Sequence, residues 1–180
     1  MVADTRKGVR AAVESARRRL AAEAQESARL EGMYSFQSDI AHGGIVVGLD
    51  EVGRGPLAGP LAVGAVVLPE QPHIPGLNDS KQVKPESREA IARRIKEVAV
   101  AWTVQYVSPE DIDAKGMTAS LLKAFRGALA VVESAGVKPD TVLLDGNPLH
   151  MDPREVNVVK GDGKCASIAA ASIVAKVERD

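Results

Sequence analysis

Short apolar runs alternate with amphipathic segments along most of the chain. Two of these runs, Ile45–Leu49 and Leu61–Leu68, are rich in β-branched residues and apolar throughout, which is typical of strands buried on both faces. The same pattern predicts further strands at Ala101–Val107, Thr141–Leu144 and Val156–Val159. Apolar residues at helical spacing predict helices over Pro85–Val98, Leu121–Glu133 and Ser167–Val177. Strands and helices in this order indicate an α/β fold, with helices flanking a central mixed sheet.

The first forty residues have a different pattern. Thr5–Glu31 is rich in Ala, Arg and Glu and has few large apolar residues. Its thin apolar stripe runs through Val9, Val13 and Leu20, which predicts an accessory helix. The following stretch is polar and ends at Gly43-Gly44. We therefore place a boundary there, with an N-terminal helical extension and linker at 1–44 and a catalytic domain at 45–180.

Length and composition limit the class of protein. With 180 residues, of which 45% are hydrophobic, the chain is long enough for one α/β domain with a substantial core. No apolar run approaches a membrane span and the N-terminus has no secretory core, so we expect a cytoplasmic protein without membrane contact. The single Cys165 rules out an internal disulfide framework; a packing role is favoured over a thiol of lowered pKa. We expect a monomer.

Carboxylates follow three of the apolar runs. Asp50 and Glu51 follow the first, Asp145 ends TVLLD, and Asp162 comes just after NVV. Taken singly, each has an ordinary explanation, because Asp-Glu before Gly suits a polar turn, Asp-Gly is a common turn dipeptide and Asp162 could cap a helix. Together they suggest one site, because the ends of separate strands meet at one edge of an open sheet.

Such a carboxylate cluster would need a cation. Like charges raise one another's pKa, and Mg²⁺ or Mn²⁺ bound to carboxylate oxygens would relieve that repulsion. Glu51 is the least secure ligand by geometry, because successive strand residues point to opposite faces, so Asp50 and Glu51 share a pocket only if the strand bends or has ended. The three histidines lie far apart in sequence and are not assigned to the site.

Five motifs, in order, resemble those of the bacterial ribonuclease HII family. They are GLDEVGRG, NDSK, LLDGN, VVKGD and ASIAAASIVAKVERD, and they cover roughly Ile45 to Asp180. The resemblance implies a ribonuclease H-like fold and a two-metal site using Mg²⁺ or Mn²⁺. It implies cleavage of RNA in RNA/DNA hybrids, and of ribonucleotides embedded in duplex DNA, leaving 3′-hydroxyl and 5′-phosphate ends.

The resemblance also implies a role for individual residues. The catalytic metal ligands would be Asp50, Glu51, Asp145 and Asp162. Gly53, Arg54 and Gly55 would form the loop that senses the ribose 2′-hydroxyl, and Lys81 would lie near the scissile phosphate. Family chains usually continue past the point where this one ends, with a tyrosine that stacks on the sugar, so we expect the C-terminal part of the family domain to be absent.

The net charge indicates that nucleic acid would bind through a few basic residues near the motifs and not over the whole surface. A net charge of −1 argues against coating of nucleic acid by bulk electrostatics. Basic residues near the motifs would instead form a positive rim, namely Arg54, Lys81, Lys84, Lys160 and Lys164. A solvated surface charge is the better interpretation of Lys84. Two other functions stay open: a nuclease of the wider ribonuclease H-like superfamily that acts on DNA, and a module that binds hybrids without turnover.

Overall fold

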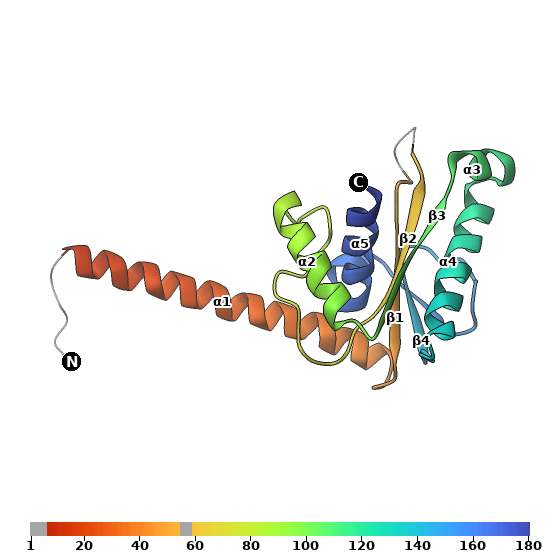
Figure 1. Ribbon diagram of the computed structural model, residues 1–180. Coiled ribbons are helices and arrows are strands. Elements are labelled where there is room, and N and C mark those ends of the chain that lie inside the picture. Colours follow the sequence, from red (N-terminus) through yellow and green to blue (C-terminus); the bar gives the residue numbers. More distant parts are fainter. Residues whose placement is uncertain (1–6, 55–58) are drawn as a thin grey trace.

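A five-stranded mixed sheet forms the centre of the molecule in the computed structural model, which describes residues 7–54 and 59–180 (Figure 1). The strand order is β3-β2-β1-β4-β5. β1 pairs antiparallel with β2 and parallel with β4, β2 pairs antiparallel with β3, and β4 pairs parallel with β5. The strands are β1 (Val46–Val52), β2 (Leu61–Val67), β3 (Ala101–Val107), β4 (Thr141–Asp145) and β5 (Glu155–Val158).

Helices cover both faces of this sheet. One face carries α2 (Pro85–Val98) and α5 (Ala166–Arg179), and the other carries α3 (Pro109–Lys115) and α4 (Met117–Ser134) (Figure 1). A short 3₁₀ turn, η1 (Gly161–Gly163), connects β5 to α5. The predicted α/β class and mixed sheet are therefore confirmed, and the helix predicted over Pro85–Val98 has the observed bounds.

Small residues let α5 lie unusually close to the sheet. A Cβ added at Gly48 of β1 would lie 2.2 Å from the Ser167 carbonyl carbon, and one at Gly64 of β2 would lie 2.4 Å from the Ala171 carbonyl oxygen. All ten residues of Ala166–Ala175 are buried. The alanine-rich sequence of α5 thus allows close approach, which brings Ser172 beside the end of β1.

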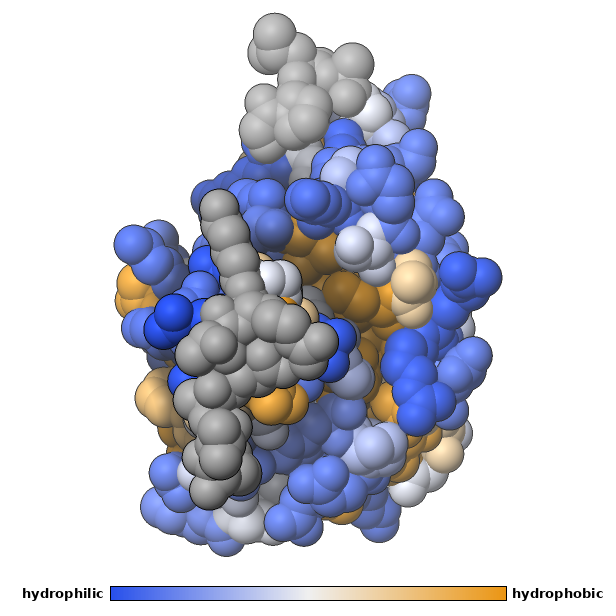
Figure 2. Space-filling view, turned by 90° about the vertical axis from the view of Figure 1, so that its left-hand side faces the viewer, coloured by the Kyte–Doolittle hydropathy of each residue, from blue (hydrophilic) through white to orange (hydrophobic). Residues whose placement is uncertain are grey.

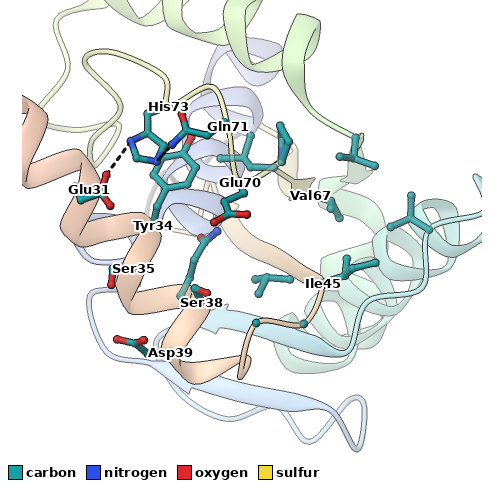
Figure 3. Close-up of a pocket in the computed structure, with 18 residues that line it drawn as sticks. Glu31, Tyr34, Ser35, Ser38, Asp39, Ile45, Val67, Glu70, Gln71 and His73 are labelled. Atoms are coloured by element: carbon teal, nitrogen blue, oxygen red, sulfur yellow. Dashed lines mark hydrogen bonds and ion pairs between the residues drawn. The ribbon is translucent and has the colours of Figure 1, made fainter.

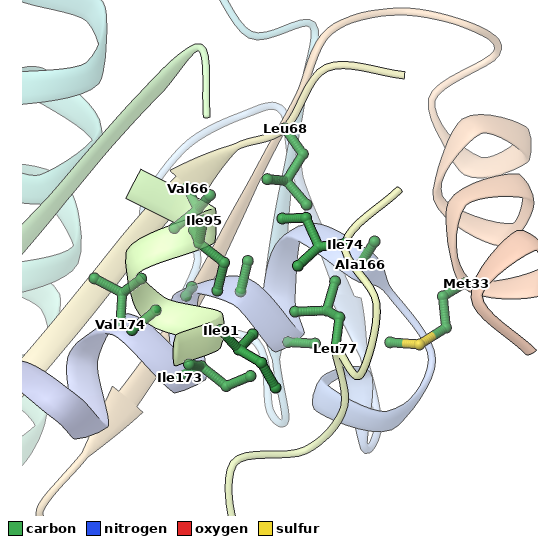
Figure 4. Close-up of a cluster of buried hydrophobic side chains, with 14 of the residues drawn as sticks. Met33, Val66, Leu68, Ile74, Leu77, Ile91, Ile95, Ala166, Ile173 and Val174 are labelled. Atoms are coloured by element: carbon green, nitrogen blue, oxygen red, sulfur yellow. The ribbon is translucent and has the colours of Figure 1, made fainter. Parts of the chain in front are cut away.

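Large apolar side chains complete the core on the same face. Ile91 and Ile95 of α2 pack with Val66 of β2, with Ile173 and Val174 of α5 and with the loop after β2 (Figure 4). A second cluster fills the other face, around Phe125 of α4. Burial of these faces orders both layers, because apolar area removed from water contributes about 25 cal/mol per Å².

The N-terminal helix is longer than predicted and joins the core. α1 runs over Lys7–Ile40 without a break, through residues that the sequence pattern assigned to a linker. Its first half projects from the body (Figure 1), and Val13 and Leu20 of the predicted stripe are 44% and 60% exposed. Its last turns are anchored instead by buried Met33 and by Gln37, whose Oε1 accepts from Ser167 N at 2.9 Å.

The surface around the protruding end of α1 is mainly polar. Figure 2 shows that hydrophilic side chains dominate the face that looks along this helix, with hydrophobic residues gathered in a hollow. Within the described part of the chain, no helix combines the length and apolar character needed to cross a membrane.

Candidate active site

Adjacent parallel strands bring two predicted carboxylates to the same edge. Leu49 of β1 is in register with Leu144 of β4, so Asp50 and Asp145, the next residue on each strand, lie at the same level. β5 continues the edge, because Asp145 pairs with Val158. The chain then turns through Lys160, whose φ of 56° is left-handed, and reaches Asp162 in η1.

Asp50 is the most deeply buried of these acids. Its carboxyl accepts a hydrogen bond from the Glu51 N–H at 2.8 Å, and the residue is 6% exposed. Burial raises the pKa of Asp50 well above its ordinary value, and the charges of Glu51, Asp145 and Asp162 act in the same direction. A hydrogen bond with the Ser172 hydroxyl acts against this rise. Asp50 therefore lies within the electrostatic field of all three other predicted ligands.

Backbone geometry ties Asp145 to Asp162. The Gly161 N–H donates to Asp145 Oδ1 at 2.6 Å, which holds η1 against the end of β4. Asp162 is buried, and burial followed by the charges of Asp145 and Asp79 raises its pKa. The Lys81 ammonium, with Nζ at 3.6 Å from Asp162 Oδ2, opposes that rise.

Glu51 is the next residue after Asp50 on β1, and strand alternation favours opposite faces of the sheet for their side chains. β1 continues to Val52, so the strand has not ended at this pair. Glu51 lines a hollow of about 280 Å³ with Phe125 and Asp145 on the α4 side, and it also borders the hollow that contains Asp50. Burial raises the pKa of Glu51, while Arg54, with Nη1 3.6 Å from Glu51 Oε1, lowers it.

The predicted substrate-binding residues border the carboxylates. Gly53, Arg54 and Lys81 line the hollow of about 310 Å³ around Asp50. Burial lowers the pKa of Lys81, but Asp162, Asp79, Asp50 and Asp145 together outweigh it, so the net shift is upward. Gly55, the third predicted loop residue, lies outside the described residues. Lys84, Lys160 and Lys164 are exposed at the surface.

The sequence interpretation missed four residues near the site. Ser172 and Ser80 are buried and hydrogen-bonded to each other through their hydroxyls at 2.9 Å. Asp79 accepts from the Lys81 N–H at 2.9 Å and shapes the turn that presents Lys81. Arg179 lines the same hollow as Asp50. All four residues stand inside the quoted motifs, but their sequence positions carry no signal of these distant contacts.

Cys165 has a packing role. It is fully buried, and burial raises the pKa of its thiol to about 12, although Lys164 acts in the opposite direction. The alternative of a thiol with lowered pKa is therefore wrong.

The donor set suits a hard divalent cation. In residues 7–54 and 59–180, no three His, Cys, Asp or Glu side chains are arranged so that they could hold a metal ion as placed. The four predicted ligands nevertheless offer only carboxylate oxygens, which Mg²⁺ and Mn²⁺ prefer. Burial first, and then repulsion from neighbouring carboxylates, raises the pKa values of Asp50 and Asp162, and a bound cation would favour the charged form of both.

A second pocket lies at the opposite end of the same strands. It has a volume of about 520 Å³ and is bordered by the last turns of α1, the start of β1 and the segment after β2 (Figure 3). The Tyr34 ring stacks on His73 with centroids 4.1 Å apart, and His73 Nδ1 lies 3.6 Å from Glu31 Oε2. Asp39 and Glu70 also line this pocket, and both are exposed.

Comparison with known proteins gives the family. The Ribonuclease HII family model matches residues 47–180, and the Ribonuclease HII N-terminal domain model matches residues 1–41. A Ribonuclease HII from Halalkalibacterium halodurans is 42% identical over 180 residues, which cover 99% of this chain and 67% of that relative. The chain thus spans about two thirds of the relative's length. The likeness includes the N-terminal helix, which the motif resemblance had left outside.

Solved structures agree on the fold. The crystal structure of ribonuclease H2 from Pyrococcus horikoshii is similar with a TM-score of 0.64 and 29% identity, covering 76% of this chain and 72% of that one. Bst-RNase HIII in complex with Mn²⁺ has a TM-score of 0.66 and 26% identity, covering 77% and 54%. With the family model matching most of its length and the sheet carrying the expected acids at one edge, the chain belongs to the Ribonuclease HII family and is an enzyme of the ribonuclease H class.

Proposed function

We propose that this protein is an endonuclease that cleaves the RNA strand of RNA/DNA hybrids and cuts at ribonucleotides embedded in duplex DNA. The observation that carries the proposal is the position of Asp50. It is buried at the end of β1, where the charges of Glu51, Asp145 and Asp162 all raise its pKa. This position is typical of a site built for a multiply charged cation, and it lies in a family of ribonucleases.

Asp50, Glu51, Asp145 and Asp162 would hold two divalent ions, Mg²⁺ or Mn²⁺. When bound, such ions supply activation of water and stabilisation of charge on the leaving oxygen. The chain's own contribution is to place these carboxylates rigidly. The Gly161 N–H fixes Asp145, the Glu51 N–H fixes one oxygen of Asp50, and the close packing of α5 excludes water from behind Asp50.

Basic and glycine residues would orient the substrate. Lys81 lies 3.6 Å from Asp162, so its ammonium is placed to meet a phosphate oxygen beside the metal ligands. Arg54 is 62% exposed and offers a planar donor fork to a second phosphate. The backbone at Gly53 and Gly55 would read the 2′-hydroxyl, the group that distinguishes RNA from DNA. Products would carry 3′-hydroxyl and 5′-phosphate ends.

One gel assay tests this function. The protein is incubated with Mg²⁺ or Mn²⁺ and three labelled duplexes: a full RNA/DNA hybrid, a DNA duplex with one ribonucleotide, and the same duplex without it. We expect cleavage of the first two only, with 5′-phosphate ends shown by resistance to further kinase labelling. Cleavage of the all-DNA duplex would instead indicate a DNA nuclease, and binding without cleavage would indicate a binding module.

A further inference from the structure

Arg179, the last residue of α5, contacts both ends of the glycine loop that follows β1. Its Nε donates to the Pro60 carbonyl at 2.8 Å, a contact between residues 119 positions apart. A Cβ added at Gly53 would lie 2.7 Å from Arg179 Nε, and one added at Gly59 would lie 3.3 Å from Nη2. Both glycines have positive φ values, +105° and +110°. The guanidinium therefore occupies the space that side chains at these positions would need.

The guanidinium is held in one orientation. The Arg179 side chain is only 12% exposed, and Nη1 lies 3.5 Å from Asp180 Oδ1. A lysine ammonium is a point charge on a flexible stem and does not present a flat face, so it would not reproduce these contacts together. The arrangement depends on the shape of arginine as well as on its charge.

We propose that Arg179 is a positioning residue that fixes the backbone at Gly53, Gly59 and Pro60, so that the Gly53 backbone is held in the geometry needed to distinguish ribose from deoxyribose. This inference rests on the proposed function, in which the loop backbone reads the 2′-hydroxyl. Discrimination by a hydrogen bond is strong only where the protein groups are held in place, because a displaced donor or acceptor serves both sugars equally poorly. Arg179 supplies that constraint from another element, without contacting the ribose.

A direct phosphate contact is the rival explanation, because Arg179 lines the same hollow as Asp50 and Lys81. The two roles differ in salt dependence. Removing one phosphate contact reduces the slope of log affinity against log salt by about 0.9, whereas removing a positioning contact leaves the slope unchanged. They also differ in the effect of lysine, which would retain much of a phosphate contact.

The experiment compares Arg179→Lys, Arg179→Met and the unmodified protein. Each is assayed for kcat and KM on the duplex with one ribonucleotide, at several salt concentrations and with Mg²⁺. We expect both variants to lose roughly 10- to 100-fold in kcat, since misplacement of about 1 Å has effects of that size, with KM and its salt dependence nearly unchanged. When the duplex with one ribonucleotide competes with the same duplex without it, we expect both variants to show a lower ratio of cleavage at the ribonucleotide to cleavage at the deoxynucleotide.

Lys96→Met is the matched control. Lys96 of α2 pairs with Glu178, the neighbour of Arg179 in α5, and is not among the described residues that border the hollow around Asp50 and Arg179. This variant tests whether loosening the end of α5 is enough to lower kcat. We expect its kcat to stay within about twofold of that of the unmodified protein. Melting curves check that all variants fold. Three results would each overturn the inference. The first is an unchanged kcat in Arg179→Lys, and the second is a weaker salt dependence of KM in Arg179→Met. The third is a loss of kcat in Lys96→Met equal to that in the Arg179 variants. Failure of the unmodified protein to cut this duplex would overturn the proposed function instead.

Discussion

Acidic side chains lie near both ends of β1, but those at one end are buried and those at the other are exposed. At the C-terminal end, Asp50 is 6% exposed and lies within the field of three other carboxylates. At the N-terminal end, Glu31 is 72% exposed and paired with His73, and the other acids of that pocket are also exposed. The pocket at the N-terminal end is the larger one, with about 520 Å³ against about 310 Å³.

The difference shows why neither pocket size nor the number of acids locates this site. Solvated carboxylates at the N-terminal end are screened by water and gain little from a cation. Buried carboxylates repel one another strongly, so a divalent ion is favoured. Burial combined with mutual repulsion therefore distinguishes the candidate active site, and substitutions at the two ends should behave differently.

The largest difference should appear in catalysis. Asp50→Asn removes a charge at the cluster without changing side-chain volume, so we expect cleavage of the hybrid to fall about 1000-fold or more, equivalent to about 4 kcal/mol of lost stabilisation. Glu70→Gln at the opposite end should leave the rate within about twofold. Single-turnover rates on the hybrid measure both. Comparable rates in Asp50→Asn and the unmodified protein would remove Asp50 from the mechanism.

Metal binding should stabilise the fold only through the carboxylates at the C-terminal end of β1. A ligand present at a hundredfold excess over Kd adds about 2.7 kcal/mol, which corresponds to roughly 5–10 °C in melting temperature for a chain of this size. We expect Mg²⁺ or Mn²⁺ to produce this shift in the unmodified protein and in Glu70→Gln, but to produce much less in Asp145→Asn. Calorimetry at low salt makes the comparison, and an unchanged shift in Asp145→Asn would exclude that carboxylate as a ligand.

Without metal, removing the charge of Asp50 should stabilise the folded protein. A carboxyl whose pKa is higher in the folded than in the unfolded protein holds more protons when folded, so the free energy of unfolding falls as pH rises. For Asp50 the fall begins near the unfolded pKa of about 3.9 and is complete above its raised folded pKa. Metal-free Asp50→Asn should therefore melt several degrees above the unmodified protein at pH 8, and the gap should narrow at lower pH.

Asp39→Asn is the control for this pH effect, because Asp39 is exposed at the other end of the strands. We expect its melting temperature to follow that of the unmodified protein within about 1 °C at every pH, since surface substitutions rarely exceed 0.5 kcal/mol. A metal-free Asp50→Asn that is less stable at pH 8 would show that the cluster does not strain the fold.

The smallest expected effect concerns the hydroxyl pair behind Asp50. Ser172→Ala leaves the Ser80 hydroxyl without its 2.9 Å partner, so we expect a loss of about 1 kcal/mol and a fall of roughly 2–4 °C in melting temperature. Ser134→Ala, at the exposed end of α4, should have almost no effect. An equal change in both variants would mean that the buried pair contributes nothing specific.

Local patterns predicted the elements well, and their bounds less well. The helix over Pro85–Val98 and the strand over Ala101–Val107 appear with the predicted bounds, because their apolar spacing and flanking breakers are local features. Ser108 caps α3 by accepting from the Asp111 N–H at 3.2 Å, a contact between residues only three positions apart. The polar stretch from Ser35 was misjudged as a linker, because nothing local signals that Gln37 caps α5 from a distant helix.

The sequence by itself determined the order of strands and helices, the motifs of the family and the placement of three acidic positions after apolar runs. The tertiary structure decided which sheet face each acid takes, with Asp50 against α5 and Glu51 toward α4, and which distant residues support them. Arg179 reaches Pro60 across 119 residues, and Ser172 reaches Ser80 across 92. Periodicity is a property of neighbours along the chain, whereas such contacts exist only after the sheet and α5 pack together.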